Sequence, residues 1–149
     1  QLYTQQKYDE VQRIAVKSSK LIFWLSLPVF IILFFLSKYL MWLYGAEFMK
    51  GALSLSILTI GQVFNTLCGP VAQVLNATGY HKQFRNISLM GMGVNILINL
   101  IIIPIYGIEG AAIANTLSML FWNIVGTIYI KKKFGFYVAY IPLVNLNKK

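Results

Sequence analysis

Apolar residues dominate four long stretches of the chain that contain no Asp, Glu, Lys or Arg. These stretches cover residues 21–37, 51–80, 86–108 and 110–130. Each approaches or exceeds the roughly 20 residues with which a helix crosses the hydrocarbon core of a bilayer. The pattern predicts an all-α integral membrane protein with four transmembrane helices, at about residues 21–43, 52–77, 86–105 and 110–130.

A water-soluble helical bundle is the alternative to this assignment. Its helices would need polar outer faces that recur at the helix period, but residues 31–36 and 100–103 are apolar on all sides. The composition agrees, since 58% of the residues are hydrophobic and only 11% are charged, whereas soluble domains carry about a quarter charged residues. A bilayer therefore suits these helices better than a soluble core.

The connections between the apolar stretches are short, at residues 44–50, 78–85 and 104–109. Short links predict that neighbouring helices are antiparallel. The last link forms an outer hairpin in which we expect Pro104 to end the third helix, because proline lacks an amide hydrogen and disfavours helical geometry in the residue before it. Gly107 and Gly110 then allow backbone angles that a side chain would forbid.

The basic residues are distributed unevenly among the connections. Eleven of the thirteen Lys and Arg lie in the first 20 residues, in the link before the third helix or in the last tail, and only Lys38 and Lys50 lie on the other side. The positive-inside rule then places both termini in the cytoplasm. The net charge of +9 thus reflects topology. Nucleic acid is not an expected partner, because these residues do not form one solvated face interleaved with stacking aromatics.

The same features divide the chain into three parts. Residues 1–20 are expected to form a cytoplasmic amphipathic linker helix, residues 21–133 the four-helix transmembrane bundle, and residues 134–149 a cytoplasmic C-terminal tail. Because the sequence starts with Gln1 and mostly polar residues precede the first apolar stretch, we expect a piece of a longer chain and no signal peptide.

Carboxamide side chains recur inside the apolar stretches. Gln62, Asn65 and Gln73 share one face of the second helix, and Asn95 and Asn99 share a face of the third. Such groups are costly against lipid, so they should face protein or a water-filled cavity. Two interpretations remain open, namely hydrogen bonding between helices and the lining of a substrate path.

Prolines interrupt two of the expected spans. Pro28 lies in the first span, and Gly69 with Pro70 in the middle of the second. A proline removes a backbone hydrogen bond and bends a membrane helix. The sequence does not distinguish a hinge from a static kink.

Lys38 is the only Lys, Arg, Asp or Glu within an expected span. Its position close to the outer end suggests a side chain that extends to the interface. The functional alternative is a bundle-facing ammonium that binds an anionic headgroup.

Residues for enzymatic chemistry are sparse. Cys68 and His81 are each the single residue of its type, and no Asp or Glu falls within an apolar stretch. The sequence therefore predicts neither a catalytic site nor a metal or cofactor site.

Several segments in order carry a resemblance to a known family. They are a proline-containing helix ending in "LYGAEF", then "QVLNATGYHKQ", "NILINLIIIPIYGIEGAAIAN" and "FWNIVGTIYIKKKFG". Together, from about residue 21 to 136, they resemble the C-terminal part of bacterial polysaccharide (oligosaccharide-lipid) flippases of the multidrug/oligosaccharidyl-lipid/polysaccharide exporter superfamily.

The resemblance implies a twelve-helix transporter with two six-helix lobes, of which this chain would be the last four helices. It also implies alternating access in the bacterial cytoplasmic membrane, an undecaprenyl-pyrophosphate-linked oligosaccharide as substrate, a role in surface polysaccharide biosynthesis, and contacts with membrane lipids and an absent N-terminal lobe. It assigns no role to Asn65, Asn95 or Lys38. The alternatives are a cation-coupled multidrug exporter of the same superfamily and a small four-helix membrane scaffold.

Overall fold

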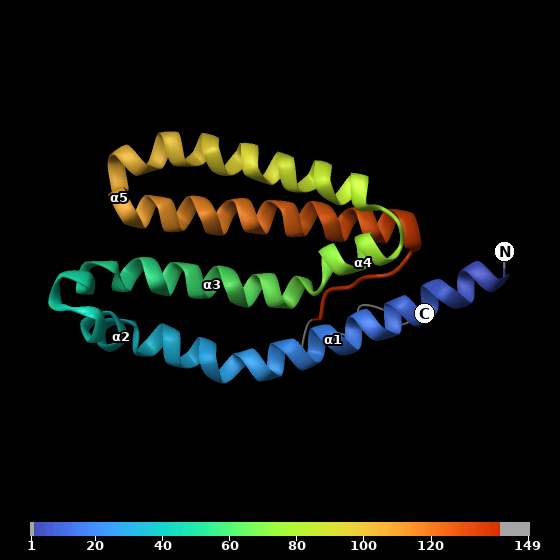
Figure 1. Cartoon of the computed structure of the whole chain (residues 1–149), viewed down its shortest axis with the longest axis horizontal. Helices are drawn as coiled ribbons and strands as arrows, with labels where there is room; N and C mark the ends of the chain where they lie inside the picture. Colours follow the sequence, from blue (N-terminus) through green and yellow to red (C-terminus); the bar gives the residue numbers. More distant parts are fainter. Residues whose placement is uncertain (1, 141–149) are drawn as a thin grey trace.

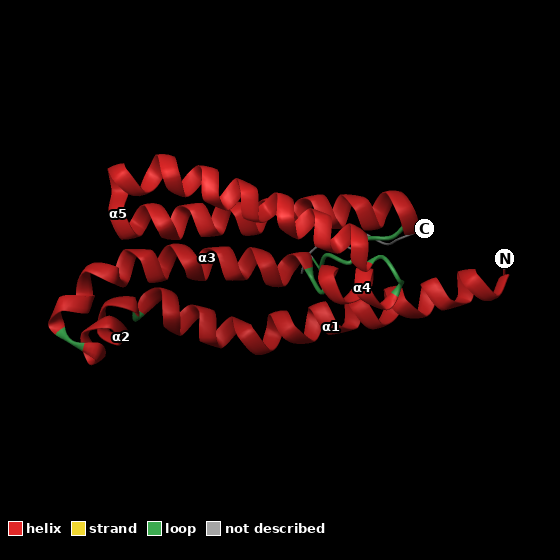
Figure 2. Ribbon diagram, turned by 45° about the horizontal axis from the view of Figure 1, so that its top comes forward, coloured by secondary structure: helices red, strands yellow, loops and turns green. Residues whose placement is uncertain are grey.

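The computed structural model describes residues 2–140, with side chains from residue 8 onward, and every regular element in this range is helical (Figures 1 and 2). The part of the expected tail at residues 141–149 lies outside the described range. The elements in chain order are α1 (Leu2–Phe35), α2 (Ser37–Tyr44), the 3-10 helix η1 (Ala46–Gly51), α3 (Ala52–Cys68), α4 (Val71–Ala77) and α5 (His81–Phe134).

Three helical stretches in the described range are long and apolar enough to cross a membrane. They are Tyr8–Phe35, Ala46–Ala77 and His81–Phe134, and the last has 54 residues. At Gly107 the backbone of α5 leaves helical geometry, with φ 56° and ψ −129°. Because this break divides α5 into two helices, the three stretches correspond to four long apolar helices, the number that the sequence predicted.

The two halves of α5 pack side by side, and Figure 1 shows α5 doubling back on itself. Gly91 lies against Trp122, and Asn95 bonds to Ser118. The turn differs from the expected one because helical structure continues through Pro104 and breaks at Gly107. Proline removes one helical hydrogen bond, which a helix can survive, whereas a φ of 56° is a conformation that favours glycine.

The second expected span is not one helix. α3 ends at Cys68, Gly69 has φ 77° and ψ −169°, and α4 begins after Pro70. Pro70 has no amide hydrogen to donate, and the positive φ of Gly69 turns the chain out of the helix. The span is therefore a discontinuous helix, and whether the break moves stays a prediction.

The expected linker helix and the first part of the first span form one continuous helix, α1. It continues through Pro28 and ends at Phe35, and α2 follows from Ser37. α1 bends along its length in Figure 1. The depth at which α1 enters the membrane stays a prediction.

Small residues bring the helices close together. A Cβ atom at Gly61 of α3 would lie 2.9 Å from Thr116 Oγ1 of α5, and one at Gly110 would lie 2.8 Å from the Ile102 carbonyl oxygen. At Gly126 a Cβ atom would overlap the side chain of Val71. Close backbone approach at small residues is the usual way in which membrane helices associate.

The chain returns to the bundle after α5. Beyond Gly135, the segment 136–140, here named the C-terminal strap, runs back toward α1 and is drawn in red in Figure 1. Its residues Phe136 and Val138 are buried in the main apolar cluster. The other buried members of that cluster are Ala15, Val71, Val74, Leu75, Ile87 and Ile130.

Many large apolar side chains outside this cluster are exposed. Leu25, Phe35 and Leu100 are 68%, 73% and 69% exposed, which would be unfavourable in water. These values agree with helices whose outer faces contact lipid or another part of a membrane protein.

Candidate functional site

A chain of three carboxamides crosses from α5 to α3. Asn123 donates its side-chain N–H to Asn65 Oδ1 at 2.9 Å and to the Met119 carbonyl oxygen at 3.0 Å. Asn65 in turn donates to Gln62 Oε1 at 3.2 Å. Asn123 is only 1% exposed, whereas Gln62 is exposed. The chain of carboxamides thus begins at buried Asn123 on the last span and ends at exposed Gln62 on the second span.

Asn123 was not among the residues that we expected at the site. The sequence did show Asn123 as a carboxamide inside the last charge-free stretch. Its partner Asn65 lies 58 positions away in sequence, so the pattern along one helix could not pair the two residues. Within the described residues, Asn123 Oδ1 is buried without a hydrogen-bond partner. A lone buried carbonyl oxygen of this kind is uncommon in proteins.

The helix break places two of the expected residues on one cavity. Asn65 at the end of α3 and Gln73 in α4 line a cavity of about 230 Å³, together with Thr66 and Trp122. The break residues from Gly69 to Ala72 and Ile22 of α1 complete its wall. The cavity combines amide and hydroxyl groups with apolar side chains.

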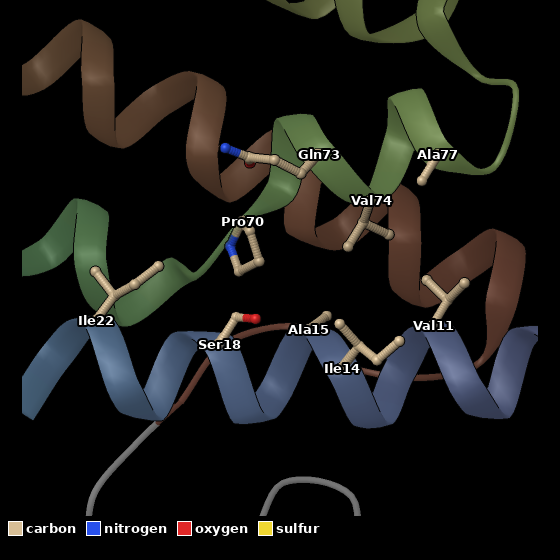
Figure 3. A pocket seen from close by; sticks show the side chains of 9 residues that line it. All are labelled: Val11, Ile14, Ala15, Ser18, Ile22, Pro70, Gln73, Val74 and Ala77. Carbon is tan, nitrogen blue, oxygen red and sulfur yellow. The ribbon is translucent and has the colours of Figure 1, made fainter.

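A second cavity of about 340 Å³ lies between α1 and α4. Figure 3 shows its lining, which is Val11, Ile14, Ala15, Ser18, Ile22, Pro70, Gln73, Val74 and Ala77. The wall is almost entirely apolar, and the amide end of Gln73 points away from α1. Because Ile22, Pro70 and Gln73 also line the first cavity, the two cavities meet at the helix break.

Asn95 and Asn99 form a separate polar group inside the α5 hairpin. Asn99 donates to both the backbone and the side-chain oxygen of Asn95 at 2.9 Å. Asn95 donates to Ser118 Oγ at 3.0 Å across the hairpin. The bond from Asn95 to Ser118 joins the two halves of the hairpin, and the bonds from Asn99 support Asn95 from one turn further along the same helix, so the contacts favour a packing role. Asn99 also borders an outer surface pocket of about 330 Å³ beside Pro104.

Lys38 lies away from both cavities at the break. It is exposed on α2, at the end of the molecule opposite α4 (Figure 1). Its neighbour Ser37 is the residue that faces inward, accepting a hydrogen bond from Ser56 at 3.2 Å. The structure therefore does not bring Lys38 together with Gln62, Asn65 or Gln73.

Acidic and metal-binding groups do not gather in the described part of the chain. Between residues 8 and 140, no group of three His, Cys, Asp or Glu side chains is close enough to hold a metal ion. The polar wall at the break is made of uncharged groups, which can donate and accept hydrogen bonds and contribute no net charge.

These features agree with the comparison of the sequence with known families, in which the MatE family profile matches residues 1–101. The chain belongs to the MatE family. A relative of this MatE chain is an uncharacterized membrane protein of Methanocaldococcus jannaschii, 32% identical over 81 residues, or 54% of this chain. The match covers 20% of the length of that relative. No solved structure matches the chain.

Membership in the MatE family agrees with the multi-pass membrane architecture of the four helices. The matched region contains α1 to α4 and the first part of α5. It therefore includes the discontinuous span and most of the residues that line the cavity at the break.

Proposed function

We propose that the MatE chain is part of a flippase that moves an oligosaccharide linked to undecaprenyl pyrophosphate across the cytoplasmic membrane. The observation that carries this proposal is the uncharged polar wall of Asn65, Thr66 and Gln73 beside the broken second span. The substrate class comes from the resemblance of the sequence to polysaccharide flippases.

The chemistry of the wall suits a sugar. Carboxamides both donate and accept hydrogen bonds, as sugar hydroxyl groups do, so they can replace the water that a sugar loses on entering the membrane. Asn65 is held by Asn123 at 2.9 Å, which fixes its carbonyl oxygen. Gln73 is exposed and free to meet a ligand in the full protein.

A discontinuous span also suits a transporter. In many transporters the substrate site lies where membrane helices are interrupted, because the interruption supplies polar backbone groups and a point about which segments can move. In the proposed flippase the break at Gly69 and Pro70 lies on such a site. An N-terminal lobe of the same protein would form the opposite wall, in a twelve-helix arrangement that opens alternately to each side.

The basic connections support a common side for both termini. The link from α4 to α5 and the lysines at 131–133 lie at the same end of the molecule as the N-terminus (Figure 1). In the proposed orientation this end faces the cytoplasm, and its lysines and Arg85 lie near the anionic headgroups of the inner leaflet.

A cation-coupled multidrug exporter is the competing transporter. Ion coupling through membrane-embedded carboxylates needs Asp or Glu within a span. In this chain Glu47 lies in η1, Glu109 beside the turn of α5, and Asp9 and Glu10 in the expected linker. None of these carboxyl groups lines the cavities at the break, which favours the sugar-lipid substrate.

Two measurements test the proposal. Single cysteines at Gln73 and Asn65, in the full-length protein with Cys68→Ser, should react with a membrane-impermeant thiol reagent. A cysteine at Leu100, which is exposed on an apolar face that we expect to contact lipid, should not react, and one at Glu47 in η1 should. If neither cavity position reacts while the Glu47 position does, the amides do not line a water-filled path.

The second measurement is export of surface polysaccharide. Gln73→Ala should reduce export severalfold at an unchanged protein level, because it removes a polar group from the cavity wall. Asn76→Ala is the matched control, since Asn76 is an exposed amide on the same short helix outside both cavities. Equal export by the two variants would argue against a sugar path at this wall.

A further inference from the structure

The break in the second span leaves a backbone carbonyl without its helical donor. In an unbroken helix the Val71 N–H would donate to the Leu67 carbonyl oxygen. Here the Val71 N–H donates to the Gly69 carbonyl oxygen at 2.8 Å. The Leu67 carbonyl oxygen accepts instead from the Tyr140 N–H at 2.8 Å. The C-terminal strap thus supplies the hydrogen bond that the break removes.

The strap fits against the break because position 69 has no side chain. A Cβ atom on Gly69 would lie 2.8 Å from the Val138 carbonyl oxygen and would overlap Ser19 Oγ. The single proton of the Ser19 hydroxyl is shared between that Val138 oxygen at 3.1 Å and the Ala15 carbonyl oxygen at 2.8 Å. Ser19 and Val138 are both 0% exposed, so strap, break and α1 meet in one dry contact.

The end of the strap is also held by α1. The ring of Tyr140 lies 6.0 Å from the ring of Phe23, and the Trp24 Nε1–H donates to the Tyr140 hydroxyl at 3.4 Å. At the other end, the strap leaves α5 at Gly135, which has φ 82° and no neighbour within 4 Å of where a Cβ would stand. The strap is therefore anchored by noncovalent contacts and joined to α5 through Gly135, whose N–H donates to the Lys131 carbonyl oxygen at 3.0 Å and whose carbonyl oxygen accepts from Lys131 Nζ at 2.9 Å.

The residues of the break also line the cavity of about 230 Å³ to which Asn65 and Gln73 belong. Asn65 belongs to α3 and Gln73 to α4, so any change in the angle between these helices changes the distance between the two amides. Contacts that fix the break also fix the cavity.

We propose that the C-terminal strap is a releasable latch on this break. While it is bound, the Tyr140 N–H and the Val138 side chain hold α3 and α4 at the angle seen here. When it swings away about Gly135, the Leu67 carbonyl loses its partner, α4 is free to turn, and the cavity changes shape. The proposal concerns motion of the chain and does not depend on which substrate is carried.

Hydrogen exchange with mass spectrometry on the full-length protein in lipid nanodiscs tests the latch. Tyr140→Pro removes the N–H that bonds to Leu67. Ala139→Pro is the matched control, because the described residues offer no hydrogen bond to the Ala139 N–H. We expect the amides of residues 71–74 to exchange about tenfold faster in Tyr140→Pro than in Ala139→Pro, since a buried carbonyl has lost its donor. Exchange at residues 95–99 in the α5 hairpin should be the same in both.

Equal exchange at residues 71–74 in the two proline variants would overturn the latch and leave the transport proposal standing. If Tyr140→Pro does not accumulate in the membrane, Ser19→Ala replaces it, because it removes the hydroxyl from the Val138 oxygen with little change in volume. Unchanged exchange in Ser19→Ala would then overturn the latch. The link to the cavity has its own readout: a cysteine at Gln73 should change its rate of thiol labelling when the strap is released, and an unchanged rate would overturn that link.

Discussion

Asn123 on the last membrane helix donates a 2.9 Å hydrogen bond to Asn65 on the second. The bond joins the MatE-matched part of the chain to residues beyond it, since the profile ends at residue 101. It fixes Asn65 at the rim of the cavity beside the helix break. The relationship connects packing of the bundle to the geometry of the proposed substrate path.

Replacing Asn123 with Ala should lower the stability of the bundle. Hydrogen bonds between membrane helices contribute about 0.6 kcal/mol on average and up to about 1.7 kcal/mol, so the loss should fall in that range and appear as a lower melting temperature in detergent. Asn115→Ala is the control, because Asn115 is exposed on the same helix half. Equal melting temperatures for the two variants would contradict a structural role for Asn123.

Two glycines of α5 offer a matched test of the hairpin turn. A Cβ would meet nothing within 4 Å at either Gly107 or Gly93, but only Gly107 has a positive φ. Gly107→Ala should therefore cost about 1–3 kcal/mol of unfolding free energy. Gly93→Ala should be neutral or stabilise the helix by about 0.5–1 kcal/mol. Thermal unfolding of both variants measures the difference, and a neutral Gly107→Ala would mean that the turn is not as described.

The contact between Gly126 and Val71 can be tested by adding and removing one side chain. Gly126→Ala should destabilise the protein by about 1–3 kcal/mol, because its Cβ would overlap the Val71 side chain. Val71→Ala in the same chain should recover part of that loss by making room. A double-mutant cycle in thermal unfolding gives the interaction free energy between the two positions. If the free-energy changes of the two single variants simply add, the two positions do not touch.

Lys38→Gln should leave export of surface polysaccharide and the protein level unchanged. Lys38 is exposed on α2 and does not line the cavities at the break, so we expect its ammonium to reach the membrane interface. Gln73→Ala, measured in the same assay, provides the contrast. A severalfold loss of export in Lys38→Gln would instead support the alternative that Lys38 binds an anionic headgroup.

The spans were predictable because a bilayer imposes a length and an absence of charge on any helix that crosses it. The break at Gly69 and Pro70 was predictable from the two residue types together, since Pro28 and Pro104 lie inside continuous helix and proline alone does not end a helix here. The position of the turn in α5 was harder to predict from the sequence. Pro104 was expected to end the helix, yet the positive φ that decides the turn is three positions later at Gly107.

Partners of individual side chains were the part that the sequence did not predict. The bond from Asn123 to Asn65 depends on how two helices are rotated about their axes, which periodicity within each helix does not determine. The return of residues 136–140 to the bundle was also unforeseen, because a segment beyond a lysine cluster resembles a solvent-exposed tail. Only the three-dimensional position of the Leu67 carbonyl shows why the Tyr140 amide is needed there.

The dependence of Leu67 on Tyr140 has a consequence for biosynthesis. The second span enters the membrane about seventy positions before its missing donor is synthesised. Until translation passes the end of α5, the Leu67 carbonyl oxygen lacks the donor that the folded chain provides. A stop codon directly after Phe134 would remove Tyr140. The second span would then contain all of its own residues but would lack the hydrogen bond to its Leu67 carbonyl oxygen.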